Sequence, residues 1–250
     1  MRGYRSKMDS ERRSRSISGW TPADHPKITL AAVILLLVFG GYLSTRYDPP
    51  PVVGIEGPSH AFSGERAFER LQTILTQADP HPLGSPANDR VRSRILQEFK
   101  DLGLDPIQND HWVSSRSSTK GTSLALARNL LVELPSSNPD LPAILLACHY
   151  DSVAAGPGAS DDAAAVASLI EIAYILMRET PLARPVFLLF TDGEEVGLVG
   201  ARGFVRFNEI ADQIGVVINL EARGNSGGSL MFETSEGNSW LVEQMAQGLD

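Results

Sequence analysis

Carboxylates and a histidine follow apolar segments at several places in this sequence. Glu194 and Glu195 lie four and five residues after the apolar run 185–190, and His149 follows the run 143–148. Adjacent carboxylates repel each other, so without a cation at least one of them tends to take up a proton. The acidic first turn of a solvated helix is the alternative interpretation of the glutamate pair alone. The other acidic residues and the histidine decide between the two.

Further acidic residues lie at the ends of predicted helices and strands. Asp161 and Asp162 begin a predicted helix after a Gly/Pro-rich loop, and Glu221 ends another apolar run. In an open α/β sheet the carboxyl ends of neighbouring strands meet at one edge, so these groups can converge in space. Oxygen and imidazole ligands without thiolate suit zinc, cobalt or manganese. Asp151 can accept a hydrogen bond from the second ring nitrogen of His149 and fix its tautomer.

Apolar periodicity and capping signals predict the elements that must carry these residues. Apolar or β-branched runs predict strands over residues 106–113, 129–134, 143–148, 185–190 and 215–220, of which the last three are expected to be buried. Helices are predicted over residues 63–76, 86–103 and 161 or 162 to 178, and from about 196 and 239 onward. Ser160 is the predicted N-cap of the third helix, and the Ser/Thr-rich loop 114–122 is expected to be mobile. Strands alternating with helices indicate an α/β fold, a three-layer sandwich with a mostly parallel central sheet.

The segment Ile28–Thr45 differs from the rest because its 18 residues carry no charge. A helix of this length spans roughly 27 Å, which is close to the hydrocarbon thickness of a bilayer. The 27 residues before it contain seven basic and three acidic side chains. The positive-inside rule therefore predicts a cytoplasmic N-terminus, with the bulk of the chain on the extracytoplasmic side, periplasmic or luminal. A cleaved signal peptide is the competing interpretation, but no small-x-small cleavage site follows Gly40-Gly41.

These observations predict a chain organised in four parts. They are a basic cytoplasmic tail (1–27), a transmembrane helix acting as signal anchor (28–45), a Pro-rich linker (46–62) and a folded domain (63–250). A composition of 42% hydrophobic and 21% charged residues is typical of a globular domain with a packed core. The net charge of −8 argues against nucleic-acid binding, which requires clustered bases, and suits a domain that holds cations. The single cysteine, Cys148, excludes a disulfide framework and a cysteine-rich zinc module.

Four motifs together resemble the zinc aminopeptidase family of clan MH, peptidase family 28. They are His149-Tyr150-Asp151, Gly158-Ala159-Ser160-Asp161-Asp162, Asp192-Gly193-Glu194-Glu195-Val196-Gly197-Leu198 and Asn219-Leu220-Glu221. The segments 80–89, 219–222 and 232–238 look most like the endoplasmic-reticulum metallopeptidase branch, which is membrane-embedded. The resemblance extends from about residue 67 to the end. It implies a zinc-exopeptidase-like fold, peptide substrates and two zinc ions in the complete domain.

The resemblance also implies metal ligands, position by position. His149 and Glu221 would bind one zinc ion, Glu195 would bind the other, and Asp161 would bridge both. Members of the family have a cis peptide bond after the bridging aspartate, which here is the bond between Asp161 and Asp162.

Two further roles and one departure complete this comparison. Glu194 would be the general base that takes a proton from water, and Asp151 would orient His149. The family's second zinc site takes a further histidine from near the end of the domain, but no histidine follows His149 in this sequence. We expect that histidine beyond Asp250, so the sequence is interpreted as a catalytic domain that is incomplete at its C-terminus.

The sequence therefore predicts a membrane-anchored, zinc-dependent exopeptidase, an aminopeptidase that hydrolyses N-terminal peptide bonds with a metal-activated water. Carboxypeptidase or glutaminyl-cyclase-like chemistry on the same fold is the first alternative. A membrane-anchored, receptor-like domain that kept the fold without the chemistry is the second, because a fold alone does not determine function.

Overall fold

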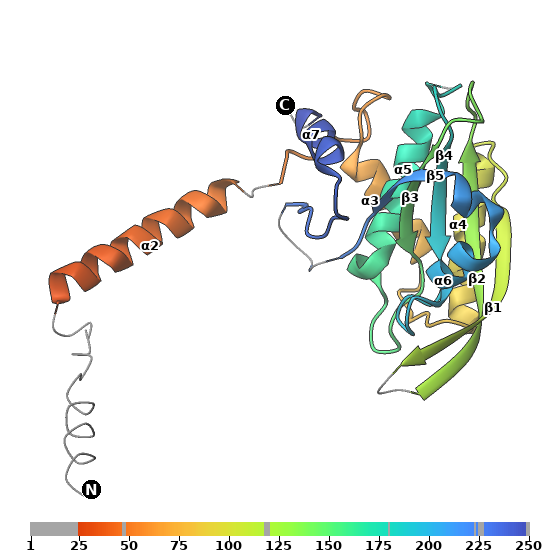
Figure 1. Cartoon of the computed structure of the whole chain (residues 1–250), viewed down its shortest axis with the longest axis horizontal. Helices are drawn as coiled ribbons and strands as arrows, with labels where there is room; N and C mark the ends of the chain where they lie inside the picture. The colour runs from red at the N-terminus through yellow and green to blue at the C-terminus, as the bar shows by residue number, and fades with distance from the viewer. Residues whose placement is uncertain are drawn as a thin grey trace, which may run out of the picture. The chain divides into compact units, whose positions relative to one another are not determined.

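A five-stranded mixed sheet forms the centre of residues 51–226 (Figure 1). The computed structural model describes residues 25–46, 49–117, 121–179, 181–222, 224 and 228–248. In the spatial order β1-β2-β4-β3-β5, the strands are β1 (Ile107–Ser117), β2 (Gly121–Leu134), β4 (Val186–Thr191), β3 (Ala143–His149) and β5 (Ile214–Asn219). β3 pairs in parallel with β4 and β5, whereas β2 pairs antiparallel with β1 and β4. The predicted α/β fold is confirmed, with a parallel half that contains the strands before the candidate site.

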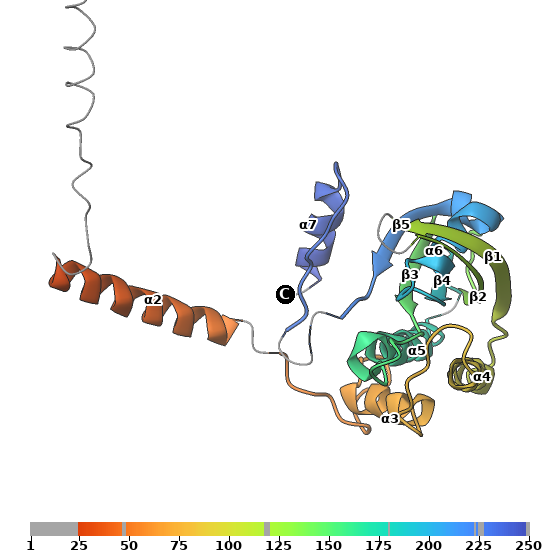
Figure 2. The same ribbon diagram turned by 90° about the horizontal axis from the view of Figure 1, so that it is seen from below.

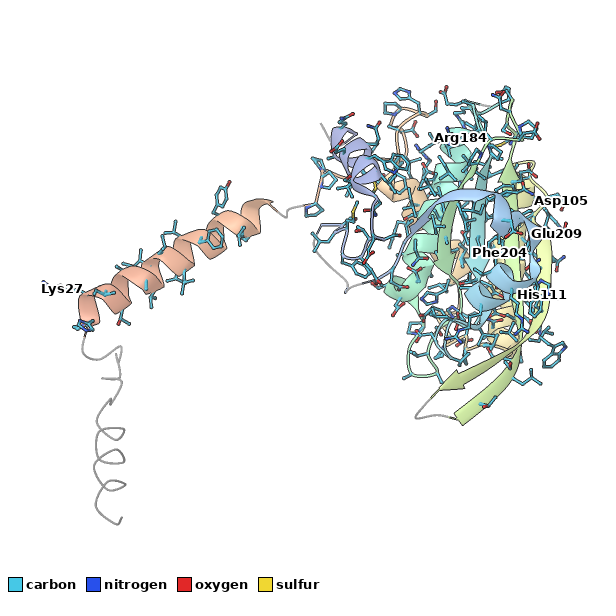
Figure 3. All side chains as sticks on the ribbon, viewed as in Figure 1. Lys27, Asp105, His111, Arg184, Phe204 and Glu209 are labelled. Atoms are coloured by element: carbon cyan, nitrogen blue, oxygen red, sulfur yellow. The ribbon has the colours of Figure 1, made fainter. Side chains whose placement is uncertain are left out.

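Helices cover both faces of this sheet. On one face lie α3 (Gly64–Ile74), α4 (Pro86–Asp101) and α5 (Ala164–Leu176), which Figure 2 shows together on one side of the strands. On the other face, α6 (Val199–Phe207) and the short helix η3 (Glu209–Gln213) pack against the sheet, with Phe204 buried among strand side chains (Figure 3). Neighbouring residues such as Leu130 and Leu131 belong to opposite cores, because side chains alternate across a strand. The fold is thus the predicted three-layer sandwich.

Two helices begin where capping chemistry predicts. The Ser63 hydroxyl accepts the N–H of Arg66 at the start of α3. The Ser85 hydroxyl accepts the N–H of Asn88 at the start of α4, where Pro86 occupies the first helical turn. Proline is favoured there because its missing N–H would have no helical partner.

The predicted loop over residues 114–122 is wrong in part. The antiparallel pairing of β1 with β2 runs from Ile107 opposite Leu131 to Ser117 opposite Gly121, so most of that segment is strand. Residues 118–120 lie outside the described residues. Continuous ladder pairing outweighs the weak local preference of serine for loops, and this explains the difference.

The prediction that the strand over residues 215–220 is buried is also wrong. Along β5 half-buried and exposed residues alternate, and Val217 is 56% exposed. In the part of the chain that the structure describes, β5 pairs with β3 alone and forms an edge of the sheet. An apolar run therefore predicted a strand but not its place in the sheet.

The remaining described segments belong to a separate unit, residues 1–50 and 227–250. Helix α2 (Pro26–Arg46) contains a 19-residue candidate membrane span, Pro26–Ser44, with a mean hydropathy of 2.0. It matches the predicted apolar helix over 28–45. Helix α7 (Ser239–Gln247) begins where a helix was predicted. Most of the basic tail, residues 1–24, lies outside the described residues.

Candidate metal centre

His149, Asp161 and Glu221 converge at the carboxyl edge of the parallel strands. His149 ends β3, and Glu221 follows β5 by two residues. Ala147 and Asn219 are register partners, so His149 and Glu221, each two residues further along, lie at the same level of the sheet edge. The Nε2 atom of His149 lies 3.0 Å from Oδ1 of Asp161 and 3.7 Å from Oε1 of Glu221. One ligand atom of each residue lies within 4.8 Å of the other two.

The chemistry of this donor set fits a zinc ion. Zinc binds imidazole nitrogen and carboxylate oxygen, and three protein ligands leave a fourth position for water or substrate. The His149 side chain is only 2% exposed, whereas the side chains of Asp161 and Glu221 are 56% and 26% exposed. The cluster is therefore anchored in the protein on the histidine side and accessible from solvent on the carboxylate side.

The turn that carries Asp161 differs from the predicted helix start. Residues Ala159–Ala163 form a π-helical turn in which Asp161 and Asp162 have non-helical backbone angles, and α5 begins only after it. The prediction of Ser160 as N-cap is wrong, because its hydroxyl instead donates a hydrogen bond to the carbonyl of Gly224. The peptide bond between the two aspartates is cis, as the family resemblance implied.

Asp162 is a buried acidic residue to which the sequence assigned no separate role. Its Oδ2 accepts the backbone N–H of His149 at 3.2 Å, whereas Asp161 contacts the imidazole ring of the same residue. Burial raises the pKa of Asp162 to about 8, and the nearby charge of Glu221 contributes to the rise. The buried position of this carboxyl group distinguishes it from its exposed neighbour, and no local sequence signal separates the two.

Asp151 contacts both His149 and the turn that carries the two glutamates. Its backbone carbonyl lies 3.0 Å from Nδ1 of His149, and its Oδ1 lies 3.5 Å from the same nitrogen. Its carboxylate also accepts the backbone N–H groups of Glu194 at 2.9 Å and Glu195 at 3.3 Å. The carbonyl thus makes the shorter contact with the ring, while the carboxylate holds the glutamate turn.

Glu194 and Glu195 lie beside the cluster, although the ligand group found among the described residues does not include them. Burial raises the pKa of Glu195, and the charge of Asp161 raises it further. Burial also raises the pKa of Glu194 and is opposed by His149, while Glu221 and the adjacent glutamate add to the rise. Both carboxylates are therefore close enough to the cluster for its charges to change their pKa values.

The charge balance of the cluster favours a cation. Burial lowers the pKa of His149, but the hydrogen bond to Asp151 and the charges of Asp162, Asp151 and Glu221 outweigh it and raise the pKa to about 10. The acidic groups thus favour a positive charge at the imidazole position.

Sequence reasoning missed the contacts that hold the start of the glutamate turn. Asp192, buried in the loop after β4, accepts a hydrogen bond from the Asn88 side chain on α4. The two residues are 104 positions apart, so no local signal could pair them. His81, between two prolines, is buried; its N–H donates to the Ser152 hydroxyl, and it is not part of the ligand cluster found among the described residues.

A cavity of about 300 Å³ adjoins the cluster. His149, Glu194 and Glu221 contribute to its wall, together with mainly apolar residues of β3, β4, β5 and α6 such as Leu189 and Phe204. The cavity is therefore lined both by polar groups that could react or bind metal and by an apolar surface.

Solved structures with this fold include two enzymes. A glutaminyl cyclase from Porphyromonas gingivalis superposes with a TM-score of 0.62 at 20% identity, covering 75% of this chain and 71% of that one. A Zn-dependent exopeptidase from Parabacteroides distasonis superposes with a TM-score of 0.56 at 17% identity, covering 68% and 64%. At these identities the similarity shows the fold alone, a zinc-exopeptidase-like α/β sandwich.

Curated relatives are more similar in sequence. A vacuolar membrane protease from Candida dubliniensis is 33% identical over 230 residues, which are 89% of this chain and 24% of the relative. Endoplasmic reticulum metallopeptidase 1 from Rattus norvegicus is 28% identical over 254 residues, covering 96% of this chain and 28% of the relative. The chain thus spans about a quarter of the length of these relatives.

Residues 129–249 match the sequence model of peptidase family M28. The match begins in β2 and includes all the motifs that carry the candidate ligands. With the relatives and the fold, it confirms the family resemblance drawn from those motifs. Residues 129–249 of the chain belong to peptidase family M28.

Proposed function

We propose that this chain forms the metal-binding core of a membrane-anchored, zinc-dependent aminopeptidase that hydrolyses N-terminal peptide bonds. The observation that carries the proposal is the convergence of His149, Asp161 and Glu221 within 4.8 Å, beside the paired glutamates. Membership of a peptidase family and relatives that are membrane proteases support peptide hydrolysis. The preference for the N-terminal bond is the finer part of the proposal.

The residues divide between two zinc sites in this proposal. His149, Asp161 and Glu221 would hold one ion, and Asp161 with Glu195 would hold a second. The charge of Asp161 already raises the pKa of Glu195, which supports a shared position for these two carboxylates. Bound zinc would lower the pKa of a water molecule and polarise the scissile carbonyl.

Glu194 is the general base in this proposal. Its carboxylate would take a proton from the attacking water and pass it to the leaving amine. Burial raises its pKa, which brings the group closer to the value that suits proton transfer near neutral pH. The hydrogen bond from its backbone N–H to Asp151 fixes the turn on which it sits.

Glutaminyl-cyclase-like chemistry is the second candidate, because a glutaminyl cyclase shares the fold. A panel of peptides with free N-termini, blocked N-termini and N-terminal glutamine separates the candidates. Release of the first residue from free N-termini alone supports an aminopeptidase, whereas release of ammonia without chain cleavage supports a cyclase. Release of the last residue irrespective of the N-terminus would support a carboxypeptidase.

Metal analysis combined with the substitution Glu194→Gln tests the proposed site. The 250-residue chain is expected to bind one zinc ion tightly through its three-ligand site. In the intact protein, Glu194→Gln should retain that zinc and lose at least about 100-fold in kcat, the scale of a lost general base. Glu133→Gln, on an exposed carboxylate of β2, is the matched control and should change neither. A chain without zinc would support the receptor-like alternative, and near-normal turnover of Glu194→Gln would remove Glu194 from this role.

A further inference from the structure

The segment 79–88, between α3 and α4, lies against both loops of the candidate site. The His81 N–H donates to the Ser152 hydroxyl at 2.8 Å, and the Ser152 N–H donates to the His81 carbonyl at 3.3 Å. Leu83 packs against Gly193, so closely that a Cβ atom on the glycine would lie 3.0 Å from Cδ2 of Leu83. This segment therefore connects the loop that follows β3 with the turn that carries the glutamates.

Asn88 makes the most specific of these contacts. Its side chain is almost fully buried, and its Nδ2 donates to Oδ1 of Asp192 at 3.1 Å and to the His81 carbonyl at 3.4 Å. Asp192 accepts a second hydrogen bond, from the Arg128 N–H at 3.2 Å, and its own N–H donates to Oδ1 of Asn129 at 3.1 Å. The buried aspartate is thus held by side-chain and backbone groups of α4 and β2.

The turn that follows is fixed at both ends. Asp192 holds its beginning, Gly193 turns the chain with a φ of 76°, and the Asp151 carboxylate accepts the N–H groups of Glu194 and Glu195. Without the Asn88 amide, the buried Asp192 carboxylate would lose one of its hydrogen-bond donors, and its Oδ1 would have to move towards another. Because Glu194 is two residues further along, such a movement would displace its carboxylate.

We propose that Asn88 is a positioning residue for Glu194, acting by holding Asp192 at the beginning of the glutamate turn. The inference rests on the proposed role of Glu194 as general base. It gives a function to the segment 79–88, to which none of the candidate metal ligands belongs.

Exchanging the amide of Asn88 and the carboxylate of Asp192 tests the positioning role of Asn88. Asn88→Asp places a second carboxylate against Asp192, whereas the double substitution Asn88→Asp with Asp192→Asn restores one amide and one carboxylate in exchanged positions. Ser85→Ala is the matched control, because the Ser85 hydroxyl caps the same helix through the Asn88 N–H without contacting Asp192. Asn88→Ala provides the simple deletion.

Two readouts separate positioning from general stability. Hydrogen exchange of the backbone amides of residues 192–195 in the 250-residue chain should become about 10- to 100-fold faster in Asn88→Asp and Asn88→Ala, the scale of a lost hydrogen bond to a charged group. In the intact protein, kcat should fall by a similar factor while KM and the zinc affinity change less than about threefold, because Asn88 contacts neither substrate nor metal ligands. Ser85→Ala should change neither, and the double substitution should recover at least half of the loss on a logarithmic scale.

The proposal is overturned if Asn88→Asp exchanges no faster than Ser85→Ala, or if the double substitution is no better than Asn88→Asp alone. Should Asn88→Asp not fold, the comparison of Asn88→Ala with Ser85→Ala gives the same decision. A protein that cleaves no peptide would refute the proposed function, but the exchange rates would still decide whether Asn88 holds the turn. Unchanged exchange in an active enzyme would refute the positioning role alone.

Discussion

Gly158 shows how closely individual residues determine the candidate site. It precedes the turn of Asp161 and has a φ of 63°, in the left-handed region that glycine adopts without strain. A Cβ atom at this position would lie 2.7 Å from Cβ of Ser152 and 2.8 Å from the carbonyl oxygen of Asp161. Any side chain here must therefore displace the backbone of a proposed metal ligand.

Gly158→Ala is accordingly expected to weaken zinc binding by at least about tenfold, the scale of disturbed support around a ligand. Gly156→Ala in the same loop is the control, because its Cβ would lie 3.9 Å from the nearest atom, at ordinary contact distance. Titration of both variants with zinc against a chelating dye provides the comparison. Equal affinities would show that the loop can relax without moving Asp161.

Protons should compete with zinc at His149. Burial lowers its pKa, but the contact with Asp151 and the surrounding carboxylates raise it to about 10. Zinc requires the neutral imidazole, so binding displaces a proton at every pH below that value. The zinc affinity should therefore increase from pH 6 to pH 8, by up to about tenfold per unit.

A competition assay at several pH values, corrected for protonation of the competing chelator, measures this slope. His60→Ala removes an exposed histidine outside the cluster and should leave the slope unchanged. A zinc affinity independent of pH over this range would mean that His149 does not lose a proton on binding.

At the scale of elements, a buried ion pair joins α3 to α5. The carboxylate of Glu171, fully buried, lies 2.6 Å from Nη2 of Arg66 and 3.6 Å from Nε of Arg70, and it also accepts the N–H of Ser63. Removing one partner of such a pair leaves the other charges buried without compensation. This contact thus fixes the helical layer over the face of the sheet opposite α6.

Glu171→Ala should therefore lower the free energy of unfolding by about 3–5 kcal/mol. The control is Asp79→Ala, which breaks the ion pair with Arg90, where the two side chains are 55% and 44% exposed. That change should cost less than about 1 kcal/mol. Urea denaturation of the chain in detergent solution compares the two, and a similar small effect of both would mean that the helices pack without the ion pair.

Local signals predicted some elements and missed others, for physical reasons that differ. The caps Ser63 and Ser85 were predictable, because a hydroxyl and an N–H three residues later suffice. Ser160 has the same local signal, but the carboxylates after it bend the backbone towards His149, a contact that only the folded sheet creates. The local sequence was thus enough to predict that a helix follows residue 160, but it did not predict where that helix begins.

The candidate site shows the same division. Strand ends and carboxylate spacing predicted that His149, Asp161 and Glu221 could meet, because parallel strands bring their carboxyl ends to one edge. The pairing of Asn88 with Asp192 was not predictable, since it depends on how α4 crosses the sheet. The exposure of β5 was missed because an apolar run does not reveal whether a strand is central or at an edge.

At the scale of the whole molecule, the apolar helix α2 bears on which side of a membrane the folded domain lies. Helix α2 is the one described helix that is long and apolar enough to span a bilayer. Basic residues precede it in a chain whose net charge is −8, and the positive-inside rule predicts a cytoplasmic N-terminus for this pattern. We therefore propose that the peptidase domain lies on the extracytoplasmic side.

Protease treatment of sealed membrane vesicles with the cytoplasmic face outward tests this arrangement. An epitope at the N-terminus should be digested, while residues 63–250 should remain intact until detergent opens the vesicles. Replacing Arg12, Arg13 and Arg15 by glutamine should increase the inverted fraction, because basic side chains near a span determine its orientation. Replacing Asp9 and Glu11 by asparagine and glutamine is the matched control, since acidic residues contribute little to this choice. Digestion of the domain in sealed vesicles would place the candidate metal centre in the cytoplasm, and loss of the epitope from undigested protein would show that the apolar segment is cleaved as a signal peptide.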